Sequence, residues 1–485
     1  MEKLIFQKSV PDRKGYILPR PEVDINISDC IEAKFLRKEA LKFPEVSELD
    51  VMRHFIALSH LNHFIEKGFY PLGSCTMKYN PKLHEAIVSS PLLSDIHPHQ
   101  TDNTVQGILE IMYELQKDLS EIAGFAQTTL QPVAGAHGEF TGLKIIKAYH
   151  ESKGNKHKNV IIFPDSAHGT NPASVTLAGM KVVEIKSNEK GMVDLETLKK
   201  VVCENTAGFM LTNPNTLGIF ETQIQEIADI IHSVDGLMYM DGANMNALLG
   251  IVKPGHIGFD VMHYNLHKTL STPHGGGGPG SGAVSVREDL VKFLPYPLVS
   301  NHKSQITNHK YYLNYDHKST SIGKIHSFNG NFAINVRAWI YLKTLGGKGL
   351  REIAENAIIN ANYIRKRLEN VYLVPHNHTY CMHEFVASGN KQKEKGIKTL
   401  DIAKRLLDKG FHAPTIYFPL NVSEAIMIEP TETESKQTLD DFIQAMLEIN
   451  QECETNPEIV LNAPFNTPVR RVDDVKAVKD LNVKY

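Results

Sequence analysis

A single lysine stands just before a run of glycines in the segment YNLHKTLSTPHGGGGPGSG, residues 264–282. Loops that bind nucleotide phosphates carry their lysine after the glycines and lead into a helix. Here Lys268 precedes the four glycines at 275–278, and the strand-like stretch GAVSVR follows at 282–287, which argues against a nucleotide-binding loop. A flexible turn would explain the glycines but not NLHKT. A lysine by itself is most often a surface residue.

An aspartate ends an apolar stretch upstream of this lysine. The stretch GLMYMD, residues 236–241, is typical of a buried strand and ends at Asp241. A buried carboxylate needs a cationic partner, and a protonated pyridine nitrogen would serve. Asp241 and Lys268 each follow a predicted strand, so their side chains could converge over one crevice. They are the minimum apparatus of a pyridoxal-phosphate enzyme, in which a lysine forms a Schiff base and an aspartate keeps the ring nitrogen protonated.

Other polar residues follow in the order that this cofactor requires. AGAHGE, residues 134–139, opens a predicted helix, where the backbone N–H groups of Gly135 and Ala136 could hold the phosphate. In DSAHGTNPAS, His168 is placed to stack on the ring, and in TNPNTLG, Asn213 is placed to hydrogen-bond the ring hydroxyl. Each residue alone could be an ordinary loop residue or helix cap, but their joint occurrence favours a cofactor site.

Three further polar residues leave two interpretations open. His267 and Thr269 flank the lysine and either contact the phosphate or are ordinary polar loop residues. His137 either lines the pocket or lies in the first turn of the helix without a role there.

Short apolar stretches alternate with helical patterns between residues 128 and 290. The alternation predicts an α/β fold with a mostly parallel, doubly wound sheet, which binds ligands at the carboxyl ends of its strands. The predicted helices lie at about 104–123, 138–152, 194–203 and 221–233. The predicted strands are 159–165, 181–186, 207–212, 236–241, 261–265 and 282–287.

The pattern divides the chain into three parts. Residues 1–100 form an irregular N-terminal segment with short helices, residues 101–330 a large domain that binds the cofactor, and residues 331–485 a smaller C-terminal α+β domain. The smaller domain opens with helices at 332–345 and 349–370. In its TETE sequence, Thr431 and Glu434 predict a capping box for the last long helix.

The composition disfavours several classes of protein. The 485 residues have a formal net charge of −3 and no long basic run, which argues against a nucleic-acid-binding protein. No apolar run is long enough to span a bilayer. The N-terminus resembles neither a secretory signal nor a transit peptide. Five scattered cysteines without a Cys-x-x-Cys pair indicate reduced thiols, so we expect a cytoplasmic protein.

The segment HNHTYCMH, residues 376–383, contains four potential metal ligands. On a strand, His376 and His378 would share one face, and Cys381 and His383 the other. Because such ligands would not converge, we expect no metal site.

Five motifs together resemble the P-protein of the glycine cleavage system, the pyridoxal-phosphate-dependent glycine decarboxylase. They are YPLGSCTMKYNP (70–81), AGAHGE, SAHGTNPAS, MDGANMNA and NLHKT with PHGGGGPG. The resemblance extends from about residue 60 to the C-terminus. This family occurs either as one longer chain or as two separate subunits, and this sequence resembles subunit 2 of the split form, which carries the lysine.

The resemblance implies a fold-type I pyridoxal-phosphate enzyme in which Lys268 forms the Schiff base. It implies that glycine binds the cofactor, that carbon dioxide is released, and that the aminomethyl group passes to the lipoyl arm of the H-protein. The implied assembly is a heterotetramer with two copies of a homologous subunit 1, which lacks the lysine. Cys75, in the first motif, either lines the pocket or is a buried thiol after a tight turn.

Two alternatives remain open: another fold-type I amino-acid decarboxylase or aminotransferase, and a structural half that only holds its partner. The presence of Lys268 argues against the structural half. Many aminotransferases of this fold clamp the substrate carboxylate with an arginine of the small domain, but between residues 372 and 469 the only arginine is Arg405, in a helical pattern. A tight clamp would stabilise the carboxylate that must leave, so its lack favours decarboxylation.

In this context the glycines at 275–278 are interpreted as a segment that leaves room for the lipoyl arm or a neighbouring subunit. Replacing Gly276 with alanine is then expected to weaken aminomethyl transfer more than Schiff-base formation.

Overall fold

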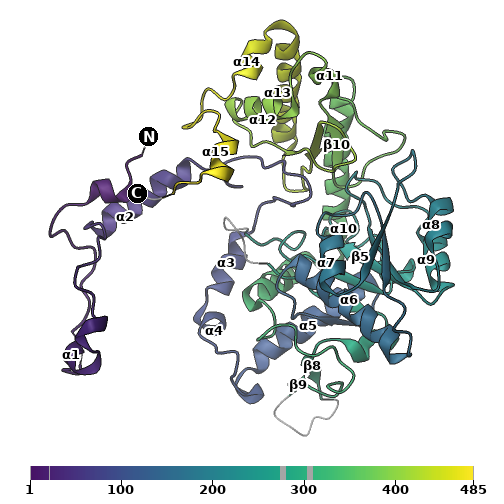
Figure 1. Ribbon diagram of the computed structural model, residues 1–485, viewed down its shortest axis with the longest axis horizontal. Helices are drawn as coiled ribbons and strands as arrows, with labels where there is room; N and C mark the ends of the chain where they lie inside the picture. Colours follow the sequence, from purple (N-terminus) through teal and green to yellow (C-terminus); the bar gives the residue numbers. More distant parts are fainter. Residues whose placement is uncertain (1, 21, 274–279, 303–309, 484–485) are drawn as a thin grey trace. The chain divides into compact units, whose positions relative to one another are not determined.

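The computed structural model describes residues 2–20, 22–273, 280–302 and 310–483 (Figure 1). The chain divides into two compact units. One is formed by Phe69–Phe465, and the other by Met1–Gly68 together with Asn466–Tyr485. Every residue that the sequence analysis assigns to the cofactor lies in the larger unit.

The larger unit is built on a seven-stranded sheet in the order β1-β7-β6-β5-β4-β2-β3. Strands β3, β2, β4, β5 and β6 run parallel to one another, and β7 pairs antiparallel with β6 and β1. The predicted mostly parallel sheet is therefore confirmed. The strands are β1 (Gln127–Thr129), β2 (Val160–Pro164), β3 (Lys181–Ile185), β4 (Thr206–Thr212), β5 (Leu237–Gly242), β6 (Val261–Tyr264) and β7 (Val284–Val286).

Helices cover both faces of this sheet (Figure 1). On β4, Phe209 and Leu211 pack against one helical layer and Met210 against the other, as the alternation of side chains along a strand requires. One layer contains α6 (Gly135–Ser152) and α7 (Asn171–Leu177). The other contains α5 (Gln106–Ala123), α8 (Leu195–Val201), α9 (Ile224–His232) and the first part of α10 (Phe332–Leu368).

A second, antiparallel sheet in the order β10-β12-β11 forms the smaller C-terminal α+β part of this unit. The two helices predicted at 332–345 and 349–370 form one element, α10, which is kinked at Gly346, where φ is 59°. The elements that follow are β10 (Phe385–Ser388), α11 (Asn390–Lys393), α12 (Thr399–Asp408), β11 (Thr415–Ile416), β12 (Ala425–Ile428), α13 (Lys436–Thr455) and α14 (Pro457–Leu461).

The capping box predicted at 431–434 is wrong. Helix α13 begins later, at Lys436, and the Ser435 side chain caps it by accepting from the Thr438 N–H group. Thr431 has a φ of 66°, which is outside the extended conformation of an N-cap residue. The larger unit also contains α3 (Lys82–Val88), α4 (Pro91–Ser94) and the hairpin of β8 (Leu298–Asn301) and β9 (Tyr311–Asn314).

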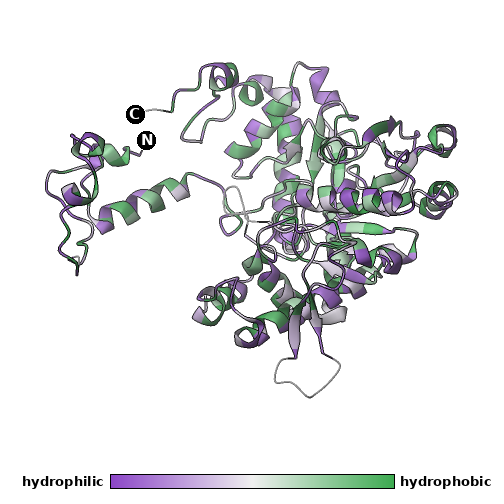
Figure 2. Cartoon of the chain, turned by 60° about the horizontal axis from the view of Figure 1, so that its bottom comes forward, coloured by the Kyte–Doolittle hydropathy of each residue, from purple (hydrophilic) through white to green (hydrophobic). Residues whose placement is uncertain are grey.

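The smaller unit contains α1 (Ile27–Cys30), α2 (Glu48–His60) and α15 (Asp474–Lys479). Helix α2 starts with a capping box in which Ser47 and Asp50 each accept the other's main-chain N–H. Figure 2 shows apolar residues distributed along α2. Across the described ranges, no helix is both long and apolar enough to cross a membrane.

Candidate active site

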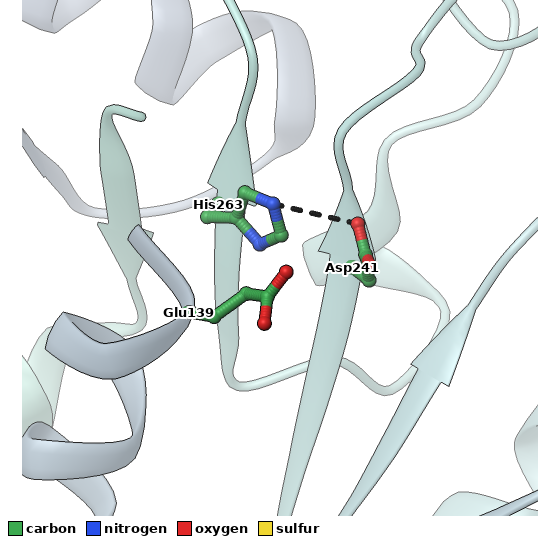
Figure 3. Close-up of side chains that lie close together, drawn as sticks. All are labelled: Glu139, Asp241 and His263. Carbon is green, nitrogen blue, oxygen red and sulfur yellow. Dashed lines mark ion pairs between the residues drawn. The ribbon is translucent and has the colours of Figure 1, made fainter. Parts of the chain in front are cut away.

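Three polar side chains meet at the carboxyl edge of the central strands. Strands β5 and β6 pair so that Asp241 lies beside His263, whose Nε2 is 3.4 Å from Asp241 Oδ1. Figure 3 shows this pair with Glu139, which reaches in from α6. The Asn171 side-chain amide donates to Asp241 Oδ2 at 3.0 Å, and the Ala243 N–H group donates to Oδ1 at 3.0 Å. The aspartate predicted from the sequence is thus buried within a polar cluster.

The surroundings of Asp241 favour its charged form. Burial raises the pKa of this carboxyl, but His263, His168 and the hydrogen bond from Asn171 lower it by more, so its pKa lies below its ordinary value. A buried anion in this position suits the protonated nitrogen of a pyridine ring. The effect of His168 also shows that this predicted residue lies within electrostatic reach of Asp241.

Glu139 organises the segment that carries His168. Its two carboxylate oxygens accept hydrogen bonds of 2.6 Å, one from the Thr170 hydroxyl and one from the Ser174 hydroxyl. The same Thr170 hydroxyl lies 3.0 Å from Nδ1 of His168. The His168 ring also packs edge-on against Phe418, with ring centroids 6.0 Å apart. The imidazole is therefore oriented from two sides.

Lys268 lies four residues after β6, in a tight turn. Its main-chain N–H donates to the Asn265 carbonyl at 2.9 Å, and its Nζ donates to the Ser74 carbonyl at 2.6 Å. Ser74 has a φ of 67°, a conformation that residues other than glycine adopt at a cost. The strained Ser74 backbone thus presents its carbonyl oxygen to the lysine amine.

The start of α6 and two asparagines match the polar groups of pyridoxal phosphate. No side chain caps α6, so the first N–H groups of the helix, including that of Ala136, can hold a phosphate. A Cβ at Gly135 would lie 2.5 Å from Asn265 Oδ1. Asn213 is buried, and its Oδ1 accepts from the Glu221 N–H at 3.0 Å. Among the described residues, Asn213 Nδ2 and Asn265 Oδ1 have no partner, so both can bind a polar ligand.

The two residues that flank Lys268 have protein partners. The Ser281 N–H donates to Nδ1 of His267 at 3.2 Å. The Thr269 hydroxyl accepts from the Met245 N–H at 2.9 Å. Thr269 therefore ties the lysine turn to the segment after β5. The glycines at 275–278, with the role suggested for them, lie outside the described residues.

His137 lies in the first turn of α6, where its Nδ1 accepts from the Val133 N–H at 3.3 Å. Burial lowers the pKa of this imidazole, and the neighbouring His326 lowers it further. The side chain is therefore neutral at pH 7 and is held by the backbone that leads into the helix.

Cys75 follows Ser74, the residue whose carbonyl accepts from the Lys268 amine. Burial raises the pKa of the Cys75 thiol, Lys268 lowers it, and Glu429 and Glu384 raise it. The net shift is upward, so the thiol stays protonated at neutral pH.

The strand assumed for residues 376–383 is wrong, because β10 begins only at Phe385 and His376 occupies a turn with a φ of 56°. Nδ1 of His376 lies 2.8 Å from the Glu189 carbonyl oxygen. Cys381 and His383 are both buried, and the charged groups that affect them most are Arg365 for Cys381 and Glu429 for His383. The side chains of this segment therefore have different surroundings.

Several residues around the site have no role in the sequence analysis, and the sequence signals of five of them differ in strength. Glu139 is a charge within a mainly buried helix, and His263 is a polar residue in a fully buried strand, so both carry a detectable signal. Glu384 and Glu429 flank two apolar strands of the smaller sheet. Ser74 acts through its backbone, which its residue type does not reveal.

Two protein-family models match the chain. Residues 353–466 match the family described as glycine dehydrogenase, C-terminal domain, and residues 140–381 match aminotransferase class-V.

Full-length relatives share more than half of the sequence. "Probable glycine dehydrogenase (decarboxylating) subunit 2" from Chloroherpeton thalassium is 57% identical over 485 residues, which cover 100% of this chain and 98% of the relative. The protein of the same description from Bacillus cytotoxicus is 54% identical over 485 residues, which cover 100% of this chain and 97% of the relative.

Solved structures resemble the chain in fold. A crystal structure of glycine decarboxylase (P-protein) of the glycine cleavage system, in inhibitor-bound form, matches with a TM-score of 0.74 and 21% identity, over 87% of this chain and 94% of that chain. Sphingosine-1-phosphate lyase of Burkholderia pseudomallei matches with a TM-score of 0.63 and 14% identity, over 88% and 95%. These matches, with the aminotransferase class-V family, confirm the predicted fold class.

Proposed function

The chain belongs to the family of glycine dehydrogenase (decarboxylating) subunit 2, and we propose that it decarboxylates glycine in the glycine cleavage system. Glycine loses carbon dioxide, and its aminomethyl group passes to the lipoyl arm of the H-protein. At the level of the site, the observation that carries the proposal is the position of Asp241 and Lys268 at the carboxyl ends of the adjacent strands β5 and β6.

Pyridoxal phosphate is the cofactor of this enzyme family. When bound, it supplies an electron-withdrawing ring that stabilises the negative charge left on the substrate carbon. We assign seven residues at strand ends, loops and the start of α6 to hold it: Lys268 covalently, Asp241 at the ring nitrogen, Asn213 at the ring hydroxyl, His168 against the ring face, and Gly135, Ala136 and His267 at the phosphate.

The protein groups prepare this site before substrate binds. Asp241 remains an anion, because its neighbours hold its pKa below the ordinary value. The Ser74 carbonyl orients the Lys268 amine. Glu139 fixes the loop of His168 through Thr170. These contacts lower the cost of arranging the reacting groups.

The small-domain arginine named above is engaged elsewhere. In α12, Arg405 donates to Glu452 at 2.8 and 2.9 Å and to Asp408 at 3.1 Å. Because this guanidinium is already paired, we propose that it does not clamp the substrate carboxylate. A carboxylate without such a clamp is easier to release as carbon dioxide.

The description of the relatives as subunit 2 implies a separate subunit 1. We propose that this partner is homologous, lacks the covalent lysine, and forms a heterotetramer with two copies of each chain. The proposed substrates are glycine and lipoylated H-protein.

The test is the exchange of labelled bicarbonate into the carboxyl group of glycine, with the chain co-purified with subunit 1. Lipoylated H-protein is expected to accelerate the exchange strongly, and H-protein without its lipoyl group serves as the control. Transamination of glycine faster than exchange would instead support an aminotransferase. If the complex with subunit 1 shows no cofactor absorbance band after pyridoxal phosphate is added, the chain would instead be a structural subunit that only holds its partner.

A further inference from the structure

Two glutamates lie side by side at strand ends of the smaller sheet. Glu384 precedes β10 and Glu429 follows β12, and the pairing of Phe385 with Ile428 in antiparallel register makes the glutamates cross-strand neighbours. Counted over the whole residue, Glu384 is 4% exposed and Glu429 is 0% exposed. One oxygen of each carboxyl and one ring nitrogen of His383 lie within 4.8 Å of one another.

The two carboxyl groups accept different numbers of hydrogen bonds. Glu429 accepts from the Thr76 N–H at 2.9 Å, from the Thr76 hydroxyl at 2.7 Å, and from the side-chain amides of Asn244 and Asn246, each at 2.8 Å. Within the described ranges, Glu384 accepts one hydrogen bond, from the Ser74 N–H at 2.7 Å. Four donors point at Glu429 and one at Glu384, so Glu384 is the carboxyl with an oxygen that accepts no hydrogen bond among the described residues. Because two adjacent buried carboxyls disfavour a second negative charge, the pair keeps a proton on Glu384.

The other groups that face Glu384 agree with this assignment. Burial raises the pKa of Glu384 well above its ordinary value, Glu429 raises it further, and Lys268 lowers it by less. Nε2 of His383 is 3.7 Å from Glu384 Oε1, and neither ring nitrogen has a hydrogen-bond partner among the described residues. Burial lowers the pKa of His383 and raises that of Cys75. The protonated carboxyl therefore lies among a neutral imidazole, a neutral thiol, the carboxyl of Glu429 and the amine of Lys268.

Ser74 connects this carboxyl to the covalent lysine. Its N–H donates to Glu384, and its carbonyl accepts from the amine of Lys268 at 2.6 Å. Glu384 and the Lys268 amine are therefore hydrogen-bonded to the same residue, which places the carboxyl near the point where the substrate's amine would replace that of the lysine.

The cluster is poorly suited to a metal ion, although its side chains are potential ligands. The Glu429 oxygens already accept hydrogen bonds from four donors. Lys268 lowers the pKa of Glu384, as a nearby positive charge does, and a positive charge would repel a metal ion.

The proposed function requires a proton at one sulfur. When the aminomethyl carbon attacks the lipoyl disulfide, a carbon–sulfur bond forms, the sulfur–sulfur bond breaks, and the electron pair leaves on the second sulfur as a thiolate. We propose that Glu384 is the general acid that protonates this sulfur. This inference rests on the proposed function, and Glu384 is one of the residues that sequence analysis did not assign.

The proton balance closes within the site. The proton leaves Glu384 Oε1, the thiolate becomes a thiol, and Glu384 becomes a carboxylate. The amine of Lys268 takes up the proton that the substrate ammonium group gives up on binding, and it releases that proton when it forms its covalent bond again. Glu384 then takes it up, and the carboxylic acid is restored.

Infrared spectroscopy of the full chain without cofactor tests the protonation state directly. At pH 8, where Glu434 is mostly ionised because burial raises its pKa only to about 7, we expect a carboxylic-acid C=O band that E384Q lacks. The matched control is E424Q. The Glu424 side chain is 7% exposed, against 6% for Glu384, but it is paired with Lys393 at 2.8 Å and should leave the band unchanged. No band in the wild type, or the same band in E384Q, would overturn the proposal.

Kinetics test the chemical role. With subunit 1, glycine and lipoylated H-protein, E384Q should lose about 10²- to 10⁴-fold in the kcat of aminomethyl transfer and keep the KM for glycine, because glutamine mimics the shape of a neutral carboxyl but cannot give up a proton. E424Q should match the wild type. Transfer by E384Q at the wild-type rate would overturn the role.

Two further outcomes are separable. If wild type and E424Q both fail to transfer the group, the proposed function fails, while the infrared band still reports the proton on Glu384. If E384Q does not fold, Glu384→Asp is used in its place, because aspartate keeps an acidic proton but its side chain is shorter by one methylene. Slower transfer at unchanged KM then supports the proposal, and an unchanged rate overturns it.

Discussion

The side-chain amine of Lys268 donates a 2.6 Å hydrogen bond to the main-chain carbonyl of Ser74, a residue 194 positions away in the sequence. Because the acceptor is a backbone atom, substitutions of the Ser74 side chain leave it in place. The segment around Ser74 also contacts the smaller sheet, where the Gly73 N–H donates to the Met427 carbonyl at 3.3 Å. Lys268 is thus oriented by a segment that lies far from it in the sequence and belongs to none of the strands of the seven-stranded sheet.

Replacing Lys268 with arginine tests its covalent role. Arginine keeps the positive charge and can still donate to Ser74, but it does not form the bond to the cofactor. We expect K268R to fold, to show no absorbance band that borohydride fixes to the chain, and to lose about 10³-fold or more of the exchange activity. Lys253, which pairs with Glu121 on the surface, gives the control K253R. A band still fixed in K268R would place the attachment at another lysine.

The variant D241N tests the partner of the ring nitrogen. Asparagine has the shape of aspartate but no charge, so the cofactor should still bind covalently while decarboxylation slows by about 10²- to 10³-fold. Absorbance titration and the exchange assay measure the two effects separately. D235N removes a carboxylate that pairs with Lys153 outside the site and should change neither. Full activity in D241N would remove Asp241 from the mechanism.

Asp241 also predicts a pH dependence of stability. Its pKa is lower in the folded chain than its ordinary value, so the charged form stabilises the fold above that ordinary value, and this contribution is lost as the pH falls through the folded pKa. The melting temperature of wild type should therefore exceed that of D241N at pH 7, and the difference should narrow only below about pH 4. If the difference in melting temperature between wild type and D241N already narrows between pH 8 and pH 6, the pKa of Asp241 is not lowered in the folded chain.

The start of α6 predicts a defect specific to the cofactor. Alanine at Gly135 would place a Cβ 2.5 Å from Asn265 Oδ1, so the asparagine side chain must move. We expect G135A to bind pyridoxal phosphate roughly tenfold more weakly, which corresponds to about 1.4 kcal/mol. The control is G107A in α5, where nothing lies within 4 Å of the added Cβ. G107A should bind the cofactor normally, and equal affinities in the two variants would show that the close approach is unimportant.

The parts of the fold that could be predicted are those with a local pattern. Strands β2 and β4 are apolar runs in a largely buried sheet, so their positions follow from the sequence. Helix α7, NPASVTL, was not predicted from the sequence, because its small and polar residues show no apolar periodicity. The antiparallel pair β8 and β9 was not predicted either, because both strands are short and only partly buried.

The candidate site shows the same limit. Asp241 and Asn213 could be singled out because each comes at the end of an apolar strand, and parallel strands bring such ends to one edge. The bond from the Ser74 N–H to Glu384 spans 310 positions, and that from Thr76 to Glu429 spans 353. Contacts at this separation depend on how the smaller sheet packs, for which no local pattern is available.

Glu434 predicts a second pH effect, opposite in sign to that of Asp241. Burial raises the pKa of its carboxyl to about 7, above the ordinary value of 4.5. The folded chain therefore holds this proton more tightly than the unfolded chain, so the contribution to stability is fully present below pH 4.5 and is lost as the pH rises through 7. Glutamine cannot ionise, so E434Q should melt at the wild-type temperature near pH 4.5 and above it at pH 8. After allowance for solvent screening, the gain at pH 8 should be about 1–2 kcal/mol. The control is E458Q. Glu458 accepts from Asn462 at an exposed position, so the melting temperatures of E458Q and wild type should differ by the same amount at both pH values. If E434Q and wild type differ equally at both pH values, the effect comes from packing and not from the titration of Glu434.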